Sequence, residues 1–485
     1  MNIDANGSVF KQRLLFFLLL ICGPALFAQQ NDHYTSTWNL EFLGSAEQAN
    51  RRAEQTDHLE LTLNEVADHL AARDFSSALE LFSALKPEDA QKTEILIIQA
   101  SIMNSAGKSA DARKIANAII AQEPENTDAL MVLADVCAVE GRDRDRRTTL
   151  ERVIRIDPSH VRALCDLGNI SLGNRGLRVS AGYFDRALAV EPDNGEALVG
   201  RATVHRYNNE LKRAEQLLNK AISEYPDWAR PLHERARLYK GSNYLNDSLA
   251  DLDKAKSLEP ANYWIIVDRG LVLLEMGRKE DALVDFSIAI GMNPNNFIAY
   301  VYSSGIMFDL GDYAGAERDF AALARLNPGY YFASEGLGMI RMKDKRWAGA
   351  RDAFLDAYKQ APREYSYALL AAICWMRAGR QTDPRQFLAQ VLRTVPRDSI
   401  EYSMIKLYHD LGGDFDVTIK VENEKNIYTK ARMLFYLASY YDIRGNTNLA
   451  NRYYMLVQEL DAVATVEWRL NEWILAERGI GLRLR

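Results

Sequence analysis

The sequence predicts an all-α solenoid of about eleven helix–turn–helix repeats, each of about 34 residues, with a capping helix at the C-terminal end. Three observations predict this fold class: a proline that recurs with a constant step, a small residue that recurs at one slot, and a glycine that recurs at another. Composition agrees, because 48% hydrophobic and 26% charged residues are typical of globular chains. The 13 prolines and 28 glycines are few for an all-β chain of 485 residues.

The prolines set the period. Nine of the 13 follow one another in eight equal steps: Pro124, Pro158, Pro192, Pro226, Pro260, Pro294, Pro328, Pro362 and Pro396. A residue before proline is pushed out of the α region, so each proline should end the second helix of a repeat. A strict period of this length indicates a repeat architecture in which every unit is a helical hairpin.

Two further slots keep the same register. Eight residues into each window there is always Ala, Gly or Ser: Ala100, Ala134, Gly168, Ala202, Ala236, Gly270, Ser304, Gly338 and Ala372. The slot expected to face it is mostly large: Leu150, Phe184, Leu218, Leu252, Phe286, Phe320, Phe354 and Leu388, with Ala116 as the exception. Two helices approach closely only where a side chain is nearly absent. The turn between helices carries Gly107, Gly141, Gly277, Gly311 and Gly379, where a helix end favours positive φ.

With these slots, and with Gly311-Asp312-Tyr313-Ala314-Gly315-Ala316 close to the consensus, the chain resembles the tetratricopeptide-repeat family over residues 93–398. The resemblance implies a right-handed superhelix whose concave face is lined by first helices and binds partners. The family's carboxylate clamp of Lys, Asn and Arg is not present, because the slots where it would lie are largely apolar. This argues against a chaperone-adaptor role.

The register divides the chain into seven expected parts. They are a signal peptide at 1–28, an N-terminal segment and leading helix at 29–57, a degenerate repeat at 58–92, nine repeats at 93–398, a degenerate repeat with an irregular insertion at 399–430, a C-terminal repeat at 431–464, and a capping helix and tail at 465–485. Within the insertion, Val417 to Val421 suggests a short extended piece. Pro384 after Asp383 predicts a late start for its helix.

The first 28 residues have the pattern of a secretory signal. Lys11 and Arg13 precede an apolar run from Leu14 to Ile21, and Gly23-Pro24 lies before a small residue, Ala28, after which cleavage is expected. An uncleaved anchor and lipidation of Cys22 are the alternatives. Export to the periplasm or outer membrane, to the cell surface or to the medium would follow. Three cysteines would remain, and Cys137, Cys165 and Cys374 sit in helical apolar patterns typical of buried small hydrophobes.

Motifs for chemistry are missing from the sequence. The net charge of −7 does not favour nucleic-acid binding. There is no His-Glu-x-x-His, Gly-rich phosphate loop or Gly-x-Ser-x-Gly, so we expect neither an enzyme nor a metal or cofactor. The arginines at 142, 144, 146 and 147 alternate with aspartates and are interpreted as a solvated helix start.

A binding face can be derived from spacing, because slots 2, 5, 9 and 12 share one face of each first helix. In the middle of the chain this face is basic, with Arg206, Arg230, His233, Arg237 and Lys240. From residue 264 onward it is apolar and predicts a partner groove, with Trp264, Val267, Leu271, Leu274, Ile298, Val301, Phe308, Phe332, Met339, Met342, Leu369, Ile373 and Met376.

Two interpretations of this apolar stripe stay open. Either the superhelix curls, or its cap folds back, and buries the stripe, or the stripe is an open groove for an apolar peptide or amphipathic helix. The favoured function is a non-enzymatic protein–protein interaction scaffold of the cell envelope, with possible peripheral association with the outer membrane. A surface-exposed adhesin and a carrier of a lipid or other hydrophobic small molecule are the alternatives.

Overall fold

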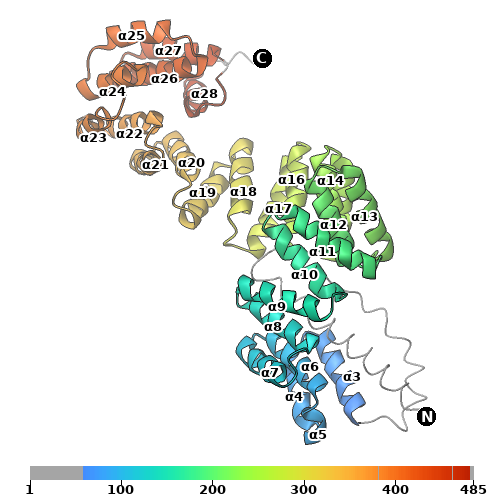
Figure 1. Ribbon diagram of the computed structural model, residues 1–485. Helices are drawn as coiled ribbons and strands as arrows, with labels where there is room; N and C mark the ends of the chain where they lie inside the picture. Colours follow the sequence, from blue (N-terminus) through green and yellow to red (C-terminus); the bar gives the residue numbers. More distant parts are fainter. Residues whose placement is uncertain (1–57, 381, 461, 481–485) are drawn as a thin grey trace, which may run out of the picture. The chain divides into compact units, whose positions relative to one another are not determined.

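The computed structural model describes residues 58–380, 382–460 and 462–480, and these ranges contain 26 α-helices and no strand. The predicted signal peptide and N-terminal segment lie outside the described residues. Apart from the short α5 and the final α28, the helices of these ranges follow one another as 12 helix–turn–helix pairs (Figure 1). The predicted all-α solenoid is therefore confirmed.

The chain divides into two compact units, with the boundary between Asp285 and Phe286 inside helix α17 (Lys279–Met292). The helices of the first unit that precede α17 are α3 (His58–Ala71), α4 (Phe75–Leu81), α5 (Pro87–Ala90), α6 (Thr93–Ser105), α7 (Ser109–Gln122), α8 (Thr127–Val139), α9 (Asp143–Ile156), α10 (Val161–Gly173), α11 (Leu177–Val190), α12 (Gly195–Tyr207), α13 (Leu211–Glu224), α14 (Ala229–Gly241), α15 (Leu245–Leu258) and α16 (Tyr263–Glu275).

The helices of the second unit that follow α17 are α18 (Phe297–Leu310), α19 (Tyr313–Leu326), α20 (Tyr331–Lys343), α21 (Trp347–Gln360), α22 (Tyr365–Arg377), α23 (Pro384–Val391), α24 (Ile400–Asp410), α25 (Asp414–Asn423), α26 (Ile427–Ile443), α27 (Thr447–Glu459) and α28 (Val466–Glu477). The predicted late start of one second helix is confirmed, because α23 begins at Pro384.

A left-handed residue recurs in the turn of each repeat. Positive φ angles between 57° and 88° return at the constant step of the repeat from Arg73 to Gly413. Five of these turn positions carry a residue other than glycine, such as Asn209 or Lys345, which accepts strain that glycine would avoid. The turn geometry is thus set by the repeat rather than by glycine alone.

The predicted close approach of paired helices is also present. A Cβ atom added at Gly168 would lie 2.7 Å from the Phe184 ring, and one added at Gly338 would lie 2.6 Å from the Phe354 ring. Both rings are fully buried. The small slot therefore exists because the large side chain of the second helix fills the space above it.

Each of three proline junctions is reinforced by a local motif, Glu-Pro-x-Asn. Asn194 caps α12 by accepting a hydrogen bond from Ala197 N at 3.0 Å, and its side-chain amide donates to Glu191 at 2.8 Å. The same arrangement occurs at Asn126 and Asn262. These caps satisfy backbone groups that a helix start leaves unpaired.

The C-terminal part corrects one prediction. Residues 414–423, expected to be irregular with an extended piece, form helix α25, which pairs with α24. Val417 and Val421 are buried, whereas Ile419 between them is 44% exposed. A strand would place all three on one face, but an α-helix places only Val417 and Val421 together. The period is also kept as far as Gly413, the positive-φ residue that precedes α25.

We expect Gly200→Ala to destabilise the first unit by about 1–3 kcal/mol, because its new Cβ would lie 2.2 Å from the buried Phe184 ring. Gly182→Ala is the matched control, since this exposed glycine inside α11 has no atom within 4 Å of the added Cβ. That substitution should stabilise by about 0.5–1 kcal/mol through helix propensity. Thermal melts that shift equally for both variants would contradict the packing described.

Candidate functional site

The basic residues predicted to share a helix face lie on α12 and α14, but each faces an acidic residue on the first helix of an adjacent repeat. The pairs are Arg206 with Glu234 (3.3 Å), Arg230 with Glu196, His233 with Asp268 (2.7 Å), Arg237 with Asp268 (2.6 Å) and Lys240 with Glu275 (3.1 Å). The structure thus corrects the prediction of a basic patch: these side chains form an ion-pair network that joins α12 to α14 and α14 to α16.

The network is largely withdrawn from solvent. Arg230, His233 and Glu234 are all buried. Burial would by itself raise the pKa of Glu234, but the guanidinium groups of Arg237 and Arg206 outweigh it and lower that pKa to about 2. The pKa of Asp268 is likewise held well below its usual range, because His233 and Arg237 outweigh the effect of burial. Both carboxyls are therefore ionised and matched by positive charge.

A second set of ion pairs escaped the sequence analysis. Arg201, Arg235 and Arg269 recur at the period of the repeat, and they pair with Asp185 (2.6 Å), Asp251 (2.7 Å) and Asp285 (2.7 Å). The spacing of the arginines is the signal that could have revealed this ladder. It joins first helices to second helices, because each of these guanidinium groups is paired with a carboxylate of the same protein.

The arginine-rich start of α9 was interpreted as a solvated helix start, and the structure agrees with this only in part. Arg144 is exposed, and Arg142 forms an exposed pair with Asp145 at 2.6 Å. Arg146, however, lies mostly buried against Asp166 of the next first helix at 3.2 Å. This residue therefore joins two repeats instead of forming a solvated charge.

On α16 the apolar stripe is mostly covered. Val267 is buried, while Trp264, Leu271 and Leu274 are partly buried. The Trp264 ring meets the edge of the Tyr263 ring at a centroid distance of 5.3 Å. This helix belongs to the first unit and keeps a small accessible apolar surface there.

In the second unit, five of the predicted groove residues belong to the core. Met339, Met342, Leu369, Ile373 and Met376 are at most 7% exposed and share one hydrophobic cluster with α26 and α28. At these positions the structure corrects the prediction of an open groove and agrees with the alternative that the end of the chain covers the stripe.

Specific contacts hold the cover in place. Helix α26 meets α22 through Tyr436 Oη, which donates to the Ser366 carbonyl at 3.2 Å. Arg432 of α26 pairs with Glu364, the residue directly before α22, at 3.0 Å. The ring of Trp473 on α28 lies 5.7 Å from that of Phe308. These contacts join residues about two repeats or more apart in the sequence, and the periodic pattern of the repeats does not predict them.

Part of the stripe stays open on α18 and α20. Ile298 is 38% exposed and Phe332 is 47% exposed, and Val301 between them in sequence is partly buried. The Phe332 ring stacks on that of Tyr331, with centroids 4.2 Å apart and planes inclined by 29°. We refer to Ile298, Val301, Tyr331 and Phe332 as the Phe332 face.

Two acidic side chains, Glu335 of α20 and Glu467 of α28, are close enough to interact electrostatically. Tyr367 donates a hydrogen bond to Glu335 of α20, and Tyr436 donates one to Glu467 of α28 at 2.5 Å. Burial raises the pKa of Glu335 to about 7, and the charges of Glu467 and Glu364 act in the same direction, while the Tyr367 hydrogen bond opposes them. Glu335 therefore changes charge near neutral pH.

Side chains that often carry chemistry have structural partners. His160 caps α10 by accepting from Ala163 N at 3.2 Å, and His205 pairs with Glu210 at 2.8 Å. The cysteines of the described ranges, Cys137, Cys165 and Cys374, are buried thiols. Within the described ranges, no group of three or more His, Cys, Asp or Glu is placed to hold a metal ion, and no helix there has the length and apolarity to cross a membrane.

We expect Phe308→Ala to loosen α28, because the Phe308 ring supports Trp473 and is itself partly buried. The cost should be about 1–3 kcal/mol, below that of a fully buried phenylalanine. Hydrogen exchange of α28 amides measures it. Phe332→Ala serves as the control and should leave that exchange nearly unchanged; equal effects would contradict the placement of these two rings.

The stability of the second unit should fall as pH rises from about 4.5 to about 7. A carboxyl whose folded pKa is raised binds more protons in the folded state than in the unfolded state over that interval. The loss should reach up to about 3 kcal/mol. Hydrogen exchange in α20 and α28, corrected for intrinsic rates, should show this trend in the wild type and lose it in Glu335→Gln. A trend that persists in Glu335→Gln would refute the assignment to this carboxyl.

The repeat pattern of the chain is also found by comparison with known protein families. A sequence profile of the tetratricopeptide repeat matches residues 105–164, 165–227, 267–331, 306–365 and 335–399, together more than half of the chain. No curated protein matches the chain significantly.

Parts of the chain are similar to three solved structures. A tetratricopeptide repeat protein from Parabacteroides merdae is 23% identical over 51% of this chain and 98% of its own, with a TM-score of 0.41. Pseudomonas aeruginosa pilF is 18% identical over 43% and 94%, with a TM-score of 0.39. YrrB, described as a repeat protein with an unusual peptide-binding site, is 16% identical over 38% and 95%, with a TM-score of 0.29. The profile matches and the repeat geometry together establish that the chain belongs to the tetratricopeptide-repeat family.

Proposed function

We propose that this protein is a non-enzymatic interaction scaffold of the cell envelope that binds an apolar peptide or helix of a partner protein at the Phe332 face. Tetratricopeptide-repeat proteins are protein-interaction scaffolds. The observation that carries the proposal is the exposure of Phe332 and Ile298 on first helices whose other predicted groove residues are buried or partly buried.

The Phe332 face has properties of a binding surface. Phe332 is stacked on Tyr331 and lies 5.5 Å from the Tyr330 ring, so the exposed ring is held by its neighbours before a partner arrives. A preordered ring loses little conformational entropy on binding. Aromatic anchors of this kind commonly contribute about 2 kcal/mol or more to an interface.

The envelope location rests on the sequence of residues 1–28, which has the composition of a cleaved signal. A partner in the envelope, or a membrane with which the protein associates peripherally, would then be encountered after export. The lipid-carrier alternative requires a cavity for its cargo. A cavity lined by α25, α26 and α27 measures about 300 Å³, which is the low end of the range for ligand pockets. Its size therefore gives the carrier alternative little support.

Photo-crosslinking in intact producing cells tests the proposal. A photoreactive amino acid at position 332 should capture a discrete protein partner that fractionates with the envelope. The same group at position 284 is the control, because Val284 is 59% exposed on a second helix. Equal capture at both positions, or none at 332, would contradict binding at the Phe332 face. Recovery of attached lipid would favour the carrier, and attachment to a second cell type would favour the adhesin.

A further inference from the structure

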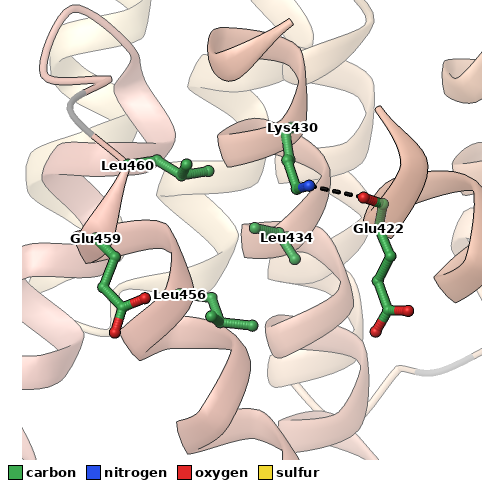
Figure 2. Close-up of a pocket in the computed structure, with 6 residues that line it drawn as sticks. All are labelled: Glu422, Lys430, Leu434, Leu456, Glu459 and Leu460. Carbon is green, nitrogen blue, oxygen red and sulfur yellow. Dashed lines mark hydrogen bonds between the residues drawn. The ribbon is translucent and has the colours of Figure 1, made fainter. Parts of the chain in front are cut away.

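A cavity of about 300 Å³ lies at the C-terminal end of the second unit, between α25, α26 and α27 (Figure 2). Leu434 of α26 forms its floor, and Leu456 and Leu460 form one side. Leu434 is buried, whereas the other two leucines are partly exposed. The cavity thus offers an apolar surface that a branched aliphatic side chain can enter.

The apolar surface continues along both flanking helices. On α25, Phe415 is 74% exposed and Ile419 is 44% exposed, and both share a helix face with Glu422 by their spacing of four and three residues. On α27, Met455 is 44% exposed and lies one turn before Glu459. Exposed apolar side chains concentrated on one face commonly mark an interaction site.

The rim of the cavity is negative. Glu422 and Glu459 line it from opposite sides and belong to the last turns of α25 and α27, where the helix dipole also favours positive charge. Lys430 is the basic residue of the lining, and its ammonium donates to the Glu422 carbonyl at 2.7 Å. Figure 2 shows the Glu422 carboxylate pointing away from that ammonium. Among the described residues, neither carboxylate has an ion-pair partner.

We propose that this cavity is a second docking site, which takes a basic amphipathic segment of a partner protein. A leucine-sized side chain of the segment enters the cavity, and lysine or arginine side chains one turn away on either side pair with Glu422 and Glu459. The charge of the rim selects a basic partner, and the three leucines select an apolar anchor. The site is formed by other helices than the Phe332 face, so it stands or falls separately from the proposed function.

The probe for this site is a synthetic helical peptide of about four turns with a row of leucines flanked by lysines, labelled for fluorescence anisotropy and carrying one photoreactive leucine. With the full chain it should bind saturably, with Kd below about 1 mM, and crosslink to α25, α26 or α27. The double variant Glu422→Lys with Glu459→Lys should weaken binding about tenfold. A peptide with glutamates in place of the lysines should bind this variant better than it binds the wild type.

A matched control separates the site from the overall charge. Glu224→Lys with Glu280→Lys changes the net charge equally, and Glu224 is also an exposed glutamate at the end of a helix, α13. This control should bind the lysine peptide like the wild type. The proposal is overturned by an absence of saturable binding, by crosslinks that map elsewhere, or by equal weakening in the two double variants.

Discussion

The close approach of two helices at the small slot of each repeat is the constraint on which the rest of the structure depends. Where Gly168 or Gly338 lies beneath a buried phenylalanine ring, no atom can be added without displacing that ring. A single helical hairpin cannot bury its apolar face alone, so each repeat depends on its neighbours for a core. The period of the repeat fixes where that contact recurs, and the left-handed turn residue from Arg73 to Gly413 recurs with it.

Features that repeat could be predicted from the sequence. The proline junctions and the small slot each return nine times at a constant step, and the turn glycines fall on the same register, so these features are visible without an alignment. Helix α25 was missed because Gly412 and Gly413 resemble an interruption, although the second of them occupies the ordinary turn slot. The prediction failed there because it gave local composition more weight than the register.

Features that depend on pairs of residues could be predicted less well. The basic face of α14 was visible, but its acidic partners Glu196 and Asp268 lie on the neighbouring helices α12 and α16, and a stripe that follows one face of one helix at a time omits them. The covering of Leu369 and Ile373 by α26 involves long sequence separations with no period. Hence the sequence could indicate which side chains share a helix face, but not which of them stay open to a partner.

The two units are stabilised by different kinds of contact between their helices. In the first, matched charges between successive first helices remove free basic groups from the surface and join the repeats. In the second, apolar closure by α26 and α28 converts most of a potential groove into core and confines its accessible part to the Phe332 face. Oxidation of methionine by hydrogen peroxide in the native protein tests directly whether α26 and α28 close the groove. The rate at which a methionine is oxidised follows the exposure of its side chain. Met455, 44% exposed, should be oxidised many times faster than Met339, Met342 and Met376, which are at most 7% exposed; equal rates for all four would show that the groove is open.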